Sequence, residues 1–329
     1  MVDHVVAVDG GNSKTDVVIA STSGRVLART RGPGVRSPLG DPAGWRDGLT
    51  ALVVEARRAA GVTAEAACAA YFLANVDLPV ERRIARRELG RAGLARTTVV
   101  GNDTLAVLRA GASREWGIAV VSGAGINAVG VHPSGRTAGF LAFGDYTGDS
   151  GGGDDLGIAA LGAAVRARDG RGPATLLATS VPAAFGLRRP EEVAVGVHTG
   201  SIPYEGLHVL APVLFAAAAD GDPVATGLVD AFADEVAVMA TALIRRLRLA
   251  RSDVEVVLGG GTLQTGNGVL HDRVAAGVTA VAPRATVAVL DAPPVFGAVV
   301  EAWTTVGASA AALRRVRRAL VPGRLTGTG

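Results

Sequence analysis

The sequence predicts an α/β protein built of two similar domains, each a mixed sheet flanked by helices. The first reason is that short apolar segments alternate along the chain with longer helical patterns, as in sheets covered by helices. The second is size, because 329 residues, of which 49% are hydrophobic, can bury more than one core. The third is that one strand, turn and strand pattern occurs twice, which indicates a duplicated domain.

The first part of the chain predicts one complete sheet. Three strands form an antiparallel meander, in which a glycine-bearing turn and then Thr22-Ser23-Gly24 make the connections. Two further strands each follow a helical pattern, which favours a mixed sheet. The expected strands lie at 5–8, 17–20, 25–30, 69–73 and 97–100, and the expected helices at 45–60 and 79–92.

The second part begins with a similar meander, whose last turn is Pro133-Ser134-Gly135. Long helical patterns follow it, then one more strand and a final long helix. The expected strands lie at 118–121, 128–131, 137–140 and 254–258, and the expected helices at 156–168, 207–219, 224–249 and 296–320.

Two segments with the same plan carry the duplication. AVDGGNSKTDVVI (Ala7 to Ile19) and VVSGAGINAVGV (Val120 to Val131) both read as an apolar strand, a glycine-bearing turn with small polar residues, and a second apolar strand. Backbone N–H groups in such a turn can hold phosphate oxygens. The alternative is that two glycine-rich hairpins resemble one another by coincidence.

Composition excludes several classes of protein. Thirty-three Lys and Arg against 30 Asp and Glu give a net charge of only +3, and 4% aromatic residues leave little to stack on bases, so no nucleic-acid partner is expected. The single cysteine, Cys68, excludes an intrachain disulfide framework and a cysteine-rich zinc site. With Asp3 and Asp9 near the start and no long apolar run, we expect a cytoplasmic protein without a membrane partner.

Three common catalytic motifs fit these turns poorly. Lys14-Thr15 follows Ser13 and precedes a strand, whereas a Walker loop needs Gly-Lys-Ser/Thr and then a helix. Gly123-Ala124-Gly125-Ile126-Asn127-Ala128 matches a Rossmann fingerprint, but a strand again follows it. Ser122 lacks the preceding glycine of a Gly-x-Ser-x-Gly elbow.

The ordered set of motifs instead resembles one family over nearly the whole chain. It resembles the N-acetylglucosamine kinase and BadF/BadG ATPase group, within the sugar kinase, Hsp70 and actin superfamily. The matching stretches are Asp9-Gly10-Gly11-Asn12-Ser13-Lys14-Thr15, Asn102-Asp103, Ser122-Gly123-Ala124-Gly125-Ile126-Asn127, Gly148-Asp149 and Leu258-Gly259-Gly260-Gly261-Thr262. The resemblance implies two ribonuclease-H-like (actin-like ATPase) domains, each with a mixed five-stranded sheet, and a cleft between them.

The resemblance also implies ATP and Mg²⁺. Asp9 would hold the Mg²⁺, for which a single carboxylate suffices because phosphate oxygens and waters supply the other ligands. The glycines after residue 258 would let the adenosine approach the backbone. The residues implied to bind ATP are Gly11, Asn12, Ser13, Lys14, Thr15, Ser122, Gly123, Gly125, Gly259, Gly260, Gly261 and Thr262.

Asp103 is the residue implied to act as general base. The sequence alone favours helix capping for an Asp at the start of a helix, and it is the resemblance that favours the general base. In the family it would deprotonate a sugar hydroxyl, that on C6, of an amino sugar such as N-acetylglucosamine or glucosamine. The residues implied to bind the sugar are Asn75, Asp103, Gly125, Phe143 and Asp149.

The sugar half of the pattern departs from the family. Where relatives have Gly-Trp-Gly and Gly-Asp-Glu-Gly, this chain has Ala142-Phe143-Gly144 and Gly148-Asp149-Ser150-Gly151. Relatives often have an Asn after a Gly-Pro or similar turn near the first hairpin, where this chain has Gly32-Pro33-Gly34-Val35-Arg36-Ser37-Pro38, and more often a Gly in the place of Asn75. Arg36 or Asn75 could therefore contact a different substituent, such as an acid or an unacetylated amine.

The expected domains are 1–114 and 115–329, with a hinge near 112–117 and the last helix able to pack back on the first domain. Relatives suggest a homodimer. Two other functions stay open: an ATPase coupled to a partner, for which the cysteines of an iron–sulfur cluster are missing, and a nucleotide- or sugar-binding regulator without catalysis. Asp103 and Asp149 favour an enzyme.

Overall fold

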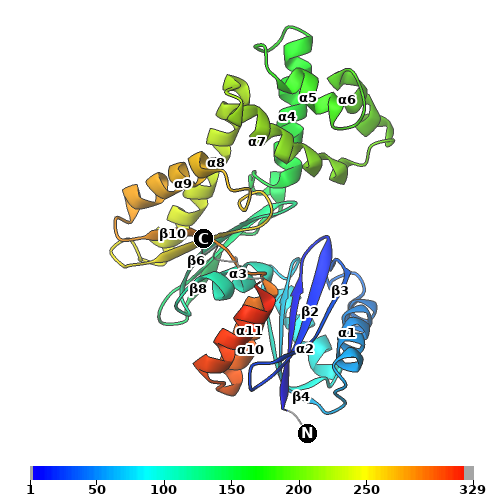
Figure 1. Cartoon of the computed structure of the whole chain (residues 1–329), viewed down its shortest axis with the longest axis vertical. Helices are drawn as coiled ribbons and strands as arrows, with labels where there is room; N and C mark the ends of the chain where they lie inside the picture. The colour runs from blue at the N-terminus through cyan, green and yellow to red at the C-terminus, as the bar shows by residue number, and fades with distance from the viewer. Residues whose placement is uncertain (1–2, 322–329) are drawn as a thin grey trace, which may run out of the picture. The chain divides into compact units, whose positions relative to one another are not determined.

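The computed structural model describes residues 3–321, which divide into two compact units. One unit takes the chain up to Glu115 together with the segment from Leu290 onward, and the other takes Trp116–Val289. Figure 1 shows the red C-terminal helices beside the blue and cyan N-terminal elements. The C-terminal segment is therefore part of the first unit.

The sheet of the first unit has five strands in the order β3-β2-β1-β4-β5. β1 pairs antiparallel with β2, and β2 with β3, whereas β4 and β5 continue parallel to β1. The prediction of a mixed five-stranded sheet is confirmed. The strands are β1 (His4–Gly10), β2 (Lys14–Ser21), β3 (Val26–Pro33), β4 (Ala66–Leu73) and β5 (Ala95–Asn102).

Helices cover both faces of this sheet. α1 (Pro42–Ala59) and α2 (Pro79–Arg91) bury Leu49, Val53 and Leu89 against alternate side chains of the strands. On the other face, α10 (Val295–Val306) packs on β1, β4 and α3 (Asp103–Gly111). A Cβ on Gly297 would lie 1.9 Å from the carbonyl oxygen of Ala106, so only glycine permits this close approach of α10 to α3.

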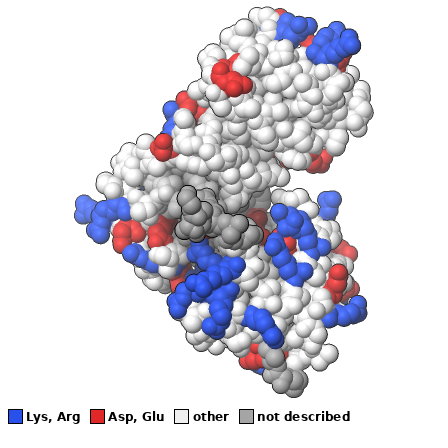
Figure 2. All heavy atoms as spheres, viewed as in Figure 1, with Lys and Arg blue, Asp and Glu red and all other residues white. Residues whose placement is uncertain are grey.

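The predicted single helix at 296–320 is wrong. The segment forms α10 and then α11 (Ala310–Leu320), because Gly307 adopts φ = 71° in the left-handed region and ends the first helix. Ser309 caps the second helix by accepting a hydrogen bond from Ala312 N (3.3 Å). Arg side chains gather over the region of α11 in Figure 2. Arg317 of this helix forms an ion pair with Asp291 (2.7 Å).

The second unit repeats the strand order of the first. Its sheet runs β10-β9-β6-β7-β8, in which β6, β7 and β8 form the antiparallel meander and β9 and β10 lie parallel to β6. The predicted duplication is thus confirmed at the level of topology. The strands are β6 (Gly117–Ser122), β7 (Ile126–Val131), β8 (Thr137–Gly139), β9 (Glu255–Gly259) and β10 (Thr286–Val289).

Helices make up most of the rest of this unit. α8 begins after Asp222, whose Oδ1 accepts from Ala225 N (2.8 Å), and packs against α9, β6 and β7. The sequence does not foresee α5, α6, α9 or the short strand β10. The helices are α4 (Gly153–Arg168), α5 (Leu177–Ala183), α6 (Pro190–Thr199), α7 (Leu210–Ala219), α8 (Pro223–Arg246) and α9 (Gly268–Val281). Within 3–321, no helix is both long and apolar enough to span a bilayer.

Candidate active site

The carboxyl ends of β1, β4 and β5 bring the polar residues of the first unit together. Ala74 N, just after β4, donates to Gly10 O at the end of β1 (2.7 Å). Asn102 Nδ2, at the end of β5, donates to Asp77 Oδ1 (2.8 Å). Because parallel strands end at one edge of a sheet, residues far apart in the sequence meet there.

The turn between β1 and β2 is held by the two loops that flank it. Gly11 N donates to Lys14 O and Val35 N donates to Gly11 O, both at 2.9 Å. A Cβ on Gly34 would lie 1.9 Å from Asn12 O, so this glycine is required for the loop to pass the turn. Asn75, at φ = 59°, donates through Nδ2 to Asn12 Oδ1 (2.8 Å).

Of the predicted ATP-binding residues in this turn, Asn12, Ser13 and Lys14 are exposed. Thr15 is buried, and its hydroxyl donates to Pro33 O (2.6 Å). The Thr15 side chain therefore fixes the end of β3 to the turn.

Asp9 lies at the end of β1 in an acidic setting. Burial, followed by the nearby carboxylates of Asp103 and Asp16, raises its pKa to about 8, while Lys14 acts in the opposite direction. A carboxyl group with these neighbours is strongly attracted to a cation, which would relieve the repulsion.

Asp9, Asp16 and Arg31 lie beside one another on the three neighbouring strands β1, β2 and β3. Asp9 faces Asp16 in the register of β1 and β2, and Asp16 faces Arg31 in that of β2 and β3. Side chains of directly opposed residues share a face. The guanidinium of Arg31 donates to both carboxylate oxygens of Asp16 at 2.9 Å, so the charge beside Asp9 is itself paired.

Asp103 is the first residue of α3. The cap of this helix is Asn102, whose Oδ1 accepts from Thr104 N (3.0 Å). Burial and then the carboxylate of Asp77 raise the pKa of Asp103 to about 7, although backbone N–H groups of Asp103 and Thr104 lower it. Asn102 therefore makes the main capping hydrogen bond of α3. Asp103 is not needed as the cap, and its pKa of about 7 lies near neutrality.

Magnesium is compatible with these donors. No cluster of three or more His, Cys, Asp and Glu suited to a metal occurs among the residues described. Mg²⁺ does not require such a cluster, because it commonly takes one or two carboxylates together with substrate phosphates and waters. Asp9, with hard oxygen donors and acidic neighbours, fits that role.

In the second unit, the turn between β6 and β7 rests on buried hydroxyl groups. Ser122 is fully buried and donates through Oγ to Gly151 O (2.6 Å). Thr262 is also buried, and its hydroxyl donates to Ser122 O (2.8 Å). Gly260 adopts φ = 91°, and a Cβ there would lie 2.1 Å from Ser122 O. The segment after β9 therefore packs directly on the end of β6.

Three further glycines, which the sequence does not single out as site residues, surround the same turn. Gly153 N donates to Gly123 O (2.7 Å), and a Cβ on Gly152 would lie 2.0 Å from Ala124 O. Asp155 Oδ2 accepts from Gly151 N and Gly152 N, both at 2.9 Å. Gly123 and Gly125 stay exposed above this support, whereas Ser122 and Thr262 do not.

The predicted sugar residues are divided between the units. Asn75 and Asp103 belong to the first unit, and Gly125, Phe143 and Asp149 to the second. Phe143 is 42% exposed, and Asp149 accepts a hydrogen bond from the Thr147 hydroxyl. The sequence misses Glu235 on α8, whose pKa is raised by burial and then by Asp149. The loop thus has a second carboxylate nearby.

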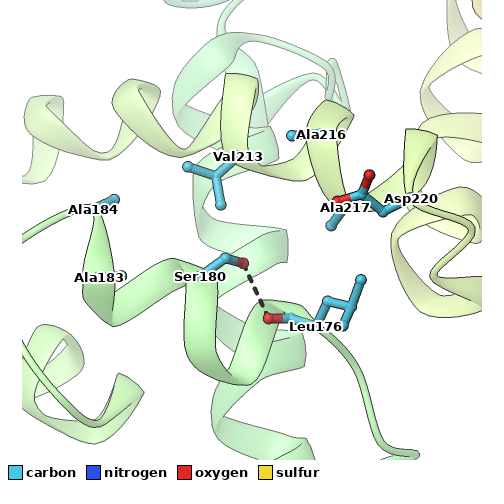
Figure 3. Close-up of a pocket in the computed structure, with 8 residues that line it drawn as sticks. All are labelled: Leu176, Ser180, Ala183, Ala184, Val213, Ala216, Ala217 and Asp220. Atoms are coloured by element: carbon cyan, nitrogen blue, oxygen red, sulfur yellow. Dashed lines mark hydrogen bonds between the residues drawn. The ribbon is translucent and has the colours of Figure 1, made fainter.

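A hollow between α5 and α7 contains none of the predicted site residues (Figure 3). Its volume is about 370 Å³, and the hydrogen bond drawn there runs from Ser180 Oγ to Leu176 O (3.1 Å). Its other lining residues are Ala183, Ala184, Val213, Ala216, Ala217 and Asp220. Small apolar side chains dominate this lining.

Known proteins resemble the chain in sequence and in fold. A curated relative, the N-acetylmuramic acid/N-acetylglucosamine kinase of Clostridium acetobutylicum, is 26% identical over 301 residues, which cover 90% of this chain and 97% of the relative. A solved structure of a candidate N-acetylglucosamine kinase from Chromobacterium violaceum matches with a TM-score of 0.69 and 24% identity, and the match covers 92% of this chain and 99% of the chain in that structure. A solved structure of a ROK family glucokinase from Streptomyces griseus matches with a TM-score of 0.57 and 18% identity, and this match covers 92% of this chain and 98% of the chain in that structure.

These solved structures share the fold of the chain over nearly its whole length, which confirms the predicted architecture. The family model of the BadF/BadG/BcrA/BcrD ATPases matches residues 6–302. That match runs from β1 to α10 and includes both glycine turns, Asp103 and the segment after β9. The chain therefore belongs to the BadF/BadG/BcrA/BcrD ATPase family.

Proposed function

We propose that the protein is an ATP-dependent kinase that phosphorylates a hydroxyl, that on C6, of an amino sugar such as N-acetylglucosamine or glucosamine. The observation that carries the proposal is Asp103, a carboxyl group with a pKa of about 7 at the edge where β1, β4 and β5 end. Family membership supports the use of ATP, and the name of the Clostridium relative supports the sugar.

Asp103 serves as the general base in this proposal. It accepts the proton of the sugar hydroxyl while the oxygen attacks the γ-phosphorus, and the bond from that phosphorus to the bridging oxygen breaks to release ADP. A general base is most effective when its pKa lies near the working pH. A carboxyl group of ordinary pKa would be ionised but a weak base, so the raised pKa of Asp103 suits the role.

The turn of the first unit supplies donors for the phosphates of ATP. Gly11 to Thr15 present backbone N–H groups, and Lys14 adds an exposed cation. Asp9 would hold Mg²⁺, which supplies neutralisation of phosphate charge when bound. Asn75 orients Asn12 through their hydrogen bond and so keeps the turn in one conformation.

The second turn and the segment after β9 provide backbone groups. Gly123, Gly125 and Gly261 are exposed and carry no side chain, so a nucleotide can approach their main chain closely. Ser122 and Thr262 belong to the site through the support that their buried hydroxyls give to these glycines. Phe143 and Asp149 would contact the sugar from their exposed loop.

Magnesium-dependent release of ADP tests the proposal. Purified protein is given ATP alone and then ATP with N-acetylglucosamine, glucosamine, N-acetylmuramic acid, glucose or N-acetylmannosamine. We expect strong stimulation by an amino sugar and none in the Asp103→Asn variant. Release that does not depend on any sugar would favour an ATPase coupled to a partner, and ATP binding without release would favour a regulator. Either result would refute the kinase.

A further inference from the structure

A hollow in the first unit, beside the turn between β1 and β2, has no role in the site described above. Its volume is about 510 Å³. The loop after β3 forms one wall, the start of α1 forms the other, and Thr15, Leu49 and Leu52 also line it. All of these elements belong to one unit, and Thr15 connects the hollow to the phosphate turn.

Arg36 is the only cationic residue in the lining of this hollow. Its guanidinium has no hydrogen bond or ion pair with any of the residues that the structure describes. Its backbone, in contrast, is fixed, because Trp45 Nε1 donates to Arg36 O (3.0 Å). An arginine whose backbone is fixed and whose guanidinium N–H groups are free is suited to donate two parallel hydrogen bonds to one carboxylate.

The one acidic residue of the lining is already engaged. Asp41 caps α1, and its Oδ1 accepts from Gly44 N (3.0 Å). The N-terminus of α1 carries partial positive charge, which the Asp41 carboxylate partly offsets. Arg36 therefore remains the unmatched charge of the hollow, and an anionic group is the ligand that it favours.

Hydrogen bonds tie the loop of Arg36 to the surroundings of the general base. Ser37 Oγ donates to Glu81 Oε1 (3.1 Å), and Glu81 Oε2 accepts from Asp77 N (3.0 Å). Asp77 in turn accepts from Asn102, the neighbour of Asp103. The same loop is also held by Asn75, whose Nδ2 donates a hydrogen bond to Val35 O (3.0 Å).

Resting on the proposed kinase function, we propose that Arg36 recognises a carboxylate on the sugar substrate, so that the preferred substrate is an acidic N-acetylated hexosamine. N-acetylmuramic acid, whose 3-O-lactyl ether ends in a carboxylate, is the simplest such sugar. Trp45, which also lines the hollow, offers apolar surface to the methyl groups of this substrate. Arg36 thus determines specificity and takes no part in the transfer itself.

The test compares N-acetylmuramic acid with its methyl ester and with N-acetylglucosamine. We expect Arg36→Ala to lower kcat/KM for the acid about 10- to 100-fold, the effect of losing a charge-assisted hydrogen bond. The values for the ester and for N-acetylglucosamine should change less than about twofold, and Arg36→Lys should retain part of the preference. Arg86→Ala, which removes an exposed arginine on α2, is the matched control.

Binding without ATP gives a second reading that does not depend on turnover. By calorimetry, the wild-type protein should bind the acid more tightly than the ester, and Arg36→Ala should remove the difference. If amino sugars are phosphorylated but the acid and ester do not differ, the specificity proposal fails and the kinase stands. If Arg36→Ala raises KM for ATP with every sugar, Arg36 binds phosphate, and the specificity proposal fails likewise. If no sugar is phosphorylated yet binding of the acid requires Arg36, the anion site stands and the kinase fails.

Discussion

Asp103→Asn is the substitution that tests the general base most directly. Asn has nearly the shape of Asp but cannot accept a proton at neutral pH, so the site should keep its geometry and lose the proton transfer. General base catalysis typically contributes about 10²- to 10⁴-fold. We therefore expect kcat to fall by about that factor at saturating ATP and sugar, measured as ADP release, with ATP binding retained.

The pH dependence gives a second, independent measure of Asp103. Only the ionised carboxylate accepts a proton, and its pKa is about 7. At saturating Mg²⁺, so that protonation of Asp9 does not limit metal binding, wild-type kcat/KM should therefore fall about tenfold for each pH unit below that value. Asp77→Asn removes a charge that raises the pKa of Asp103, so the fall should move to lower pH, while the amide oxygen of the new side chain can still accept from Asn102.

Stability separates loss of the base from loss of the fold. The folded protein keeps a proton on Asp103 up to about pH 7, whereas the unfolded chain releases it near 3.8. The folded state thus binds more protons between these values, and stability falls as pH rises through them. Asp103→Asn removes this penalty, so its melting temperature at pH 8 should equal or exceed that of the wild type. Wild-type turnover in a folded, ATP-binding Asp103→Asn protein would refute the general base.

Four further outcomes are expected. Mn²⁺ can replace Mg²⁺ as a probe whose binding is measured by electron paramagnetic resonance. Its binding should be lost in Asp9→Asn and should weaken in the wild type below pH about 8, because protons compete for the same carboxylate. Binding that does not depend on pH would contradict this role of Asp9. Gly152→Ala should destabilise the protein by about 1–3 kcal/mol or more in urea unfolding, because its Cβ would meet a backbone oxygen at 2.0 Å. Gly162→Ala is the control: Gly162 lies inside α4, the helix that follows Gly152, and a Cβ there would have nothing within 4 Å, so this change should be neutral or stabilising. Ser122→Ala should cost about 1–3 kcal/mol in the same assay, since it leaves buried partners unsatisfied. Burial raises the pKa of the Cys68 thiol to about 11, so iodoacetamide should label the unfolded chain and spare the native one.

The strands and the duplication could be predicted because they depend on local pattern. Each glycine turn stands between two apolar runs, and that arrangement alone indicates a hairpin. The break at Gly307 was hidden because the apolar spacing continues across it, although the glycine itself is a helix-ending signal. β10 has only four residues, of which two are exposed, so its pattern is too short to stand out.

The candidate site could be predicted only in part, because the residues that the sequence does not reveal come together through strand register and long-range packing. Asp16 could have been noticed as a charge within an apolar strand opposite the alternating arginines of β3, but its partner Arg31 follows only from the pairing of β2 with β3. Asp77 and Glu235 lie in segments with no motif, and their proximity to Asp103 and Asp149 arises from the fold. Sequence motifs mark the groups that do chemistry more readily than the groups that tune them.

The two units share a strand order but differ in the chemistry of the turn at the end of each sheet. The edge of the first sheet collects carboxyl groups, and burial followed by repulsion from neighbouring carboxylates raises the pKa of Asp9 and Asp103, an arrangement that costs stability and favours a cation and a base. The turn of the second sheet is held by buried hydroxyls and by glycines in contact with backbone, which fix its geometry without charge. Conservative changes in the first unit, such as Asp103→Asn, should therefore alter chemistry more than stability. Changes such as Gly152→Ala should alter stability first, and activity only as the turn is lost.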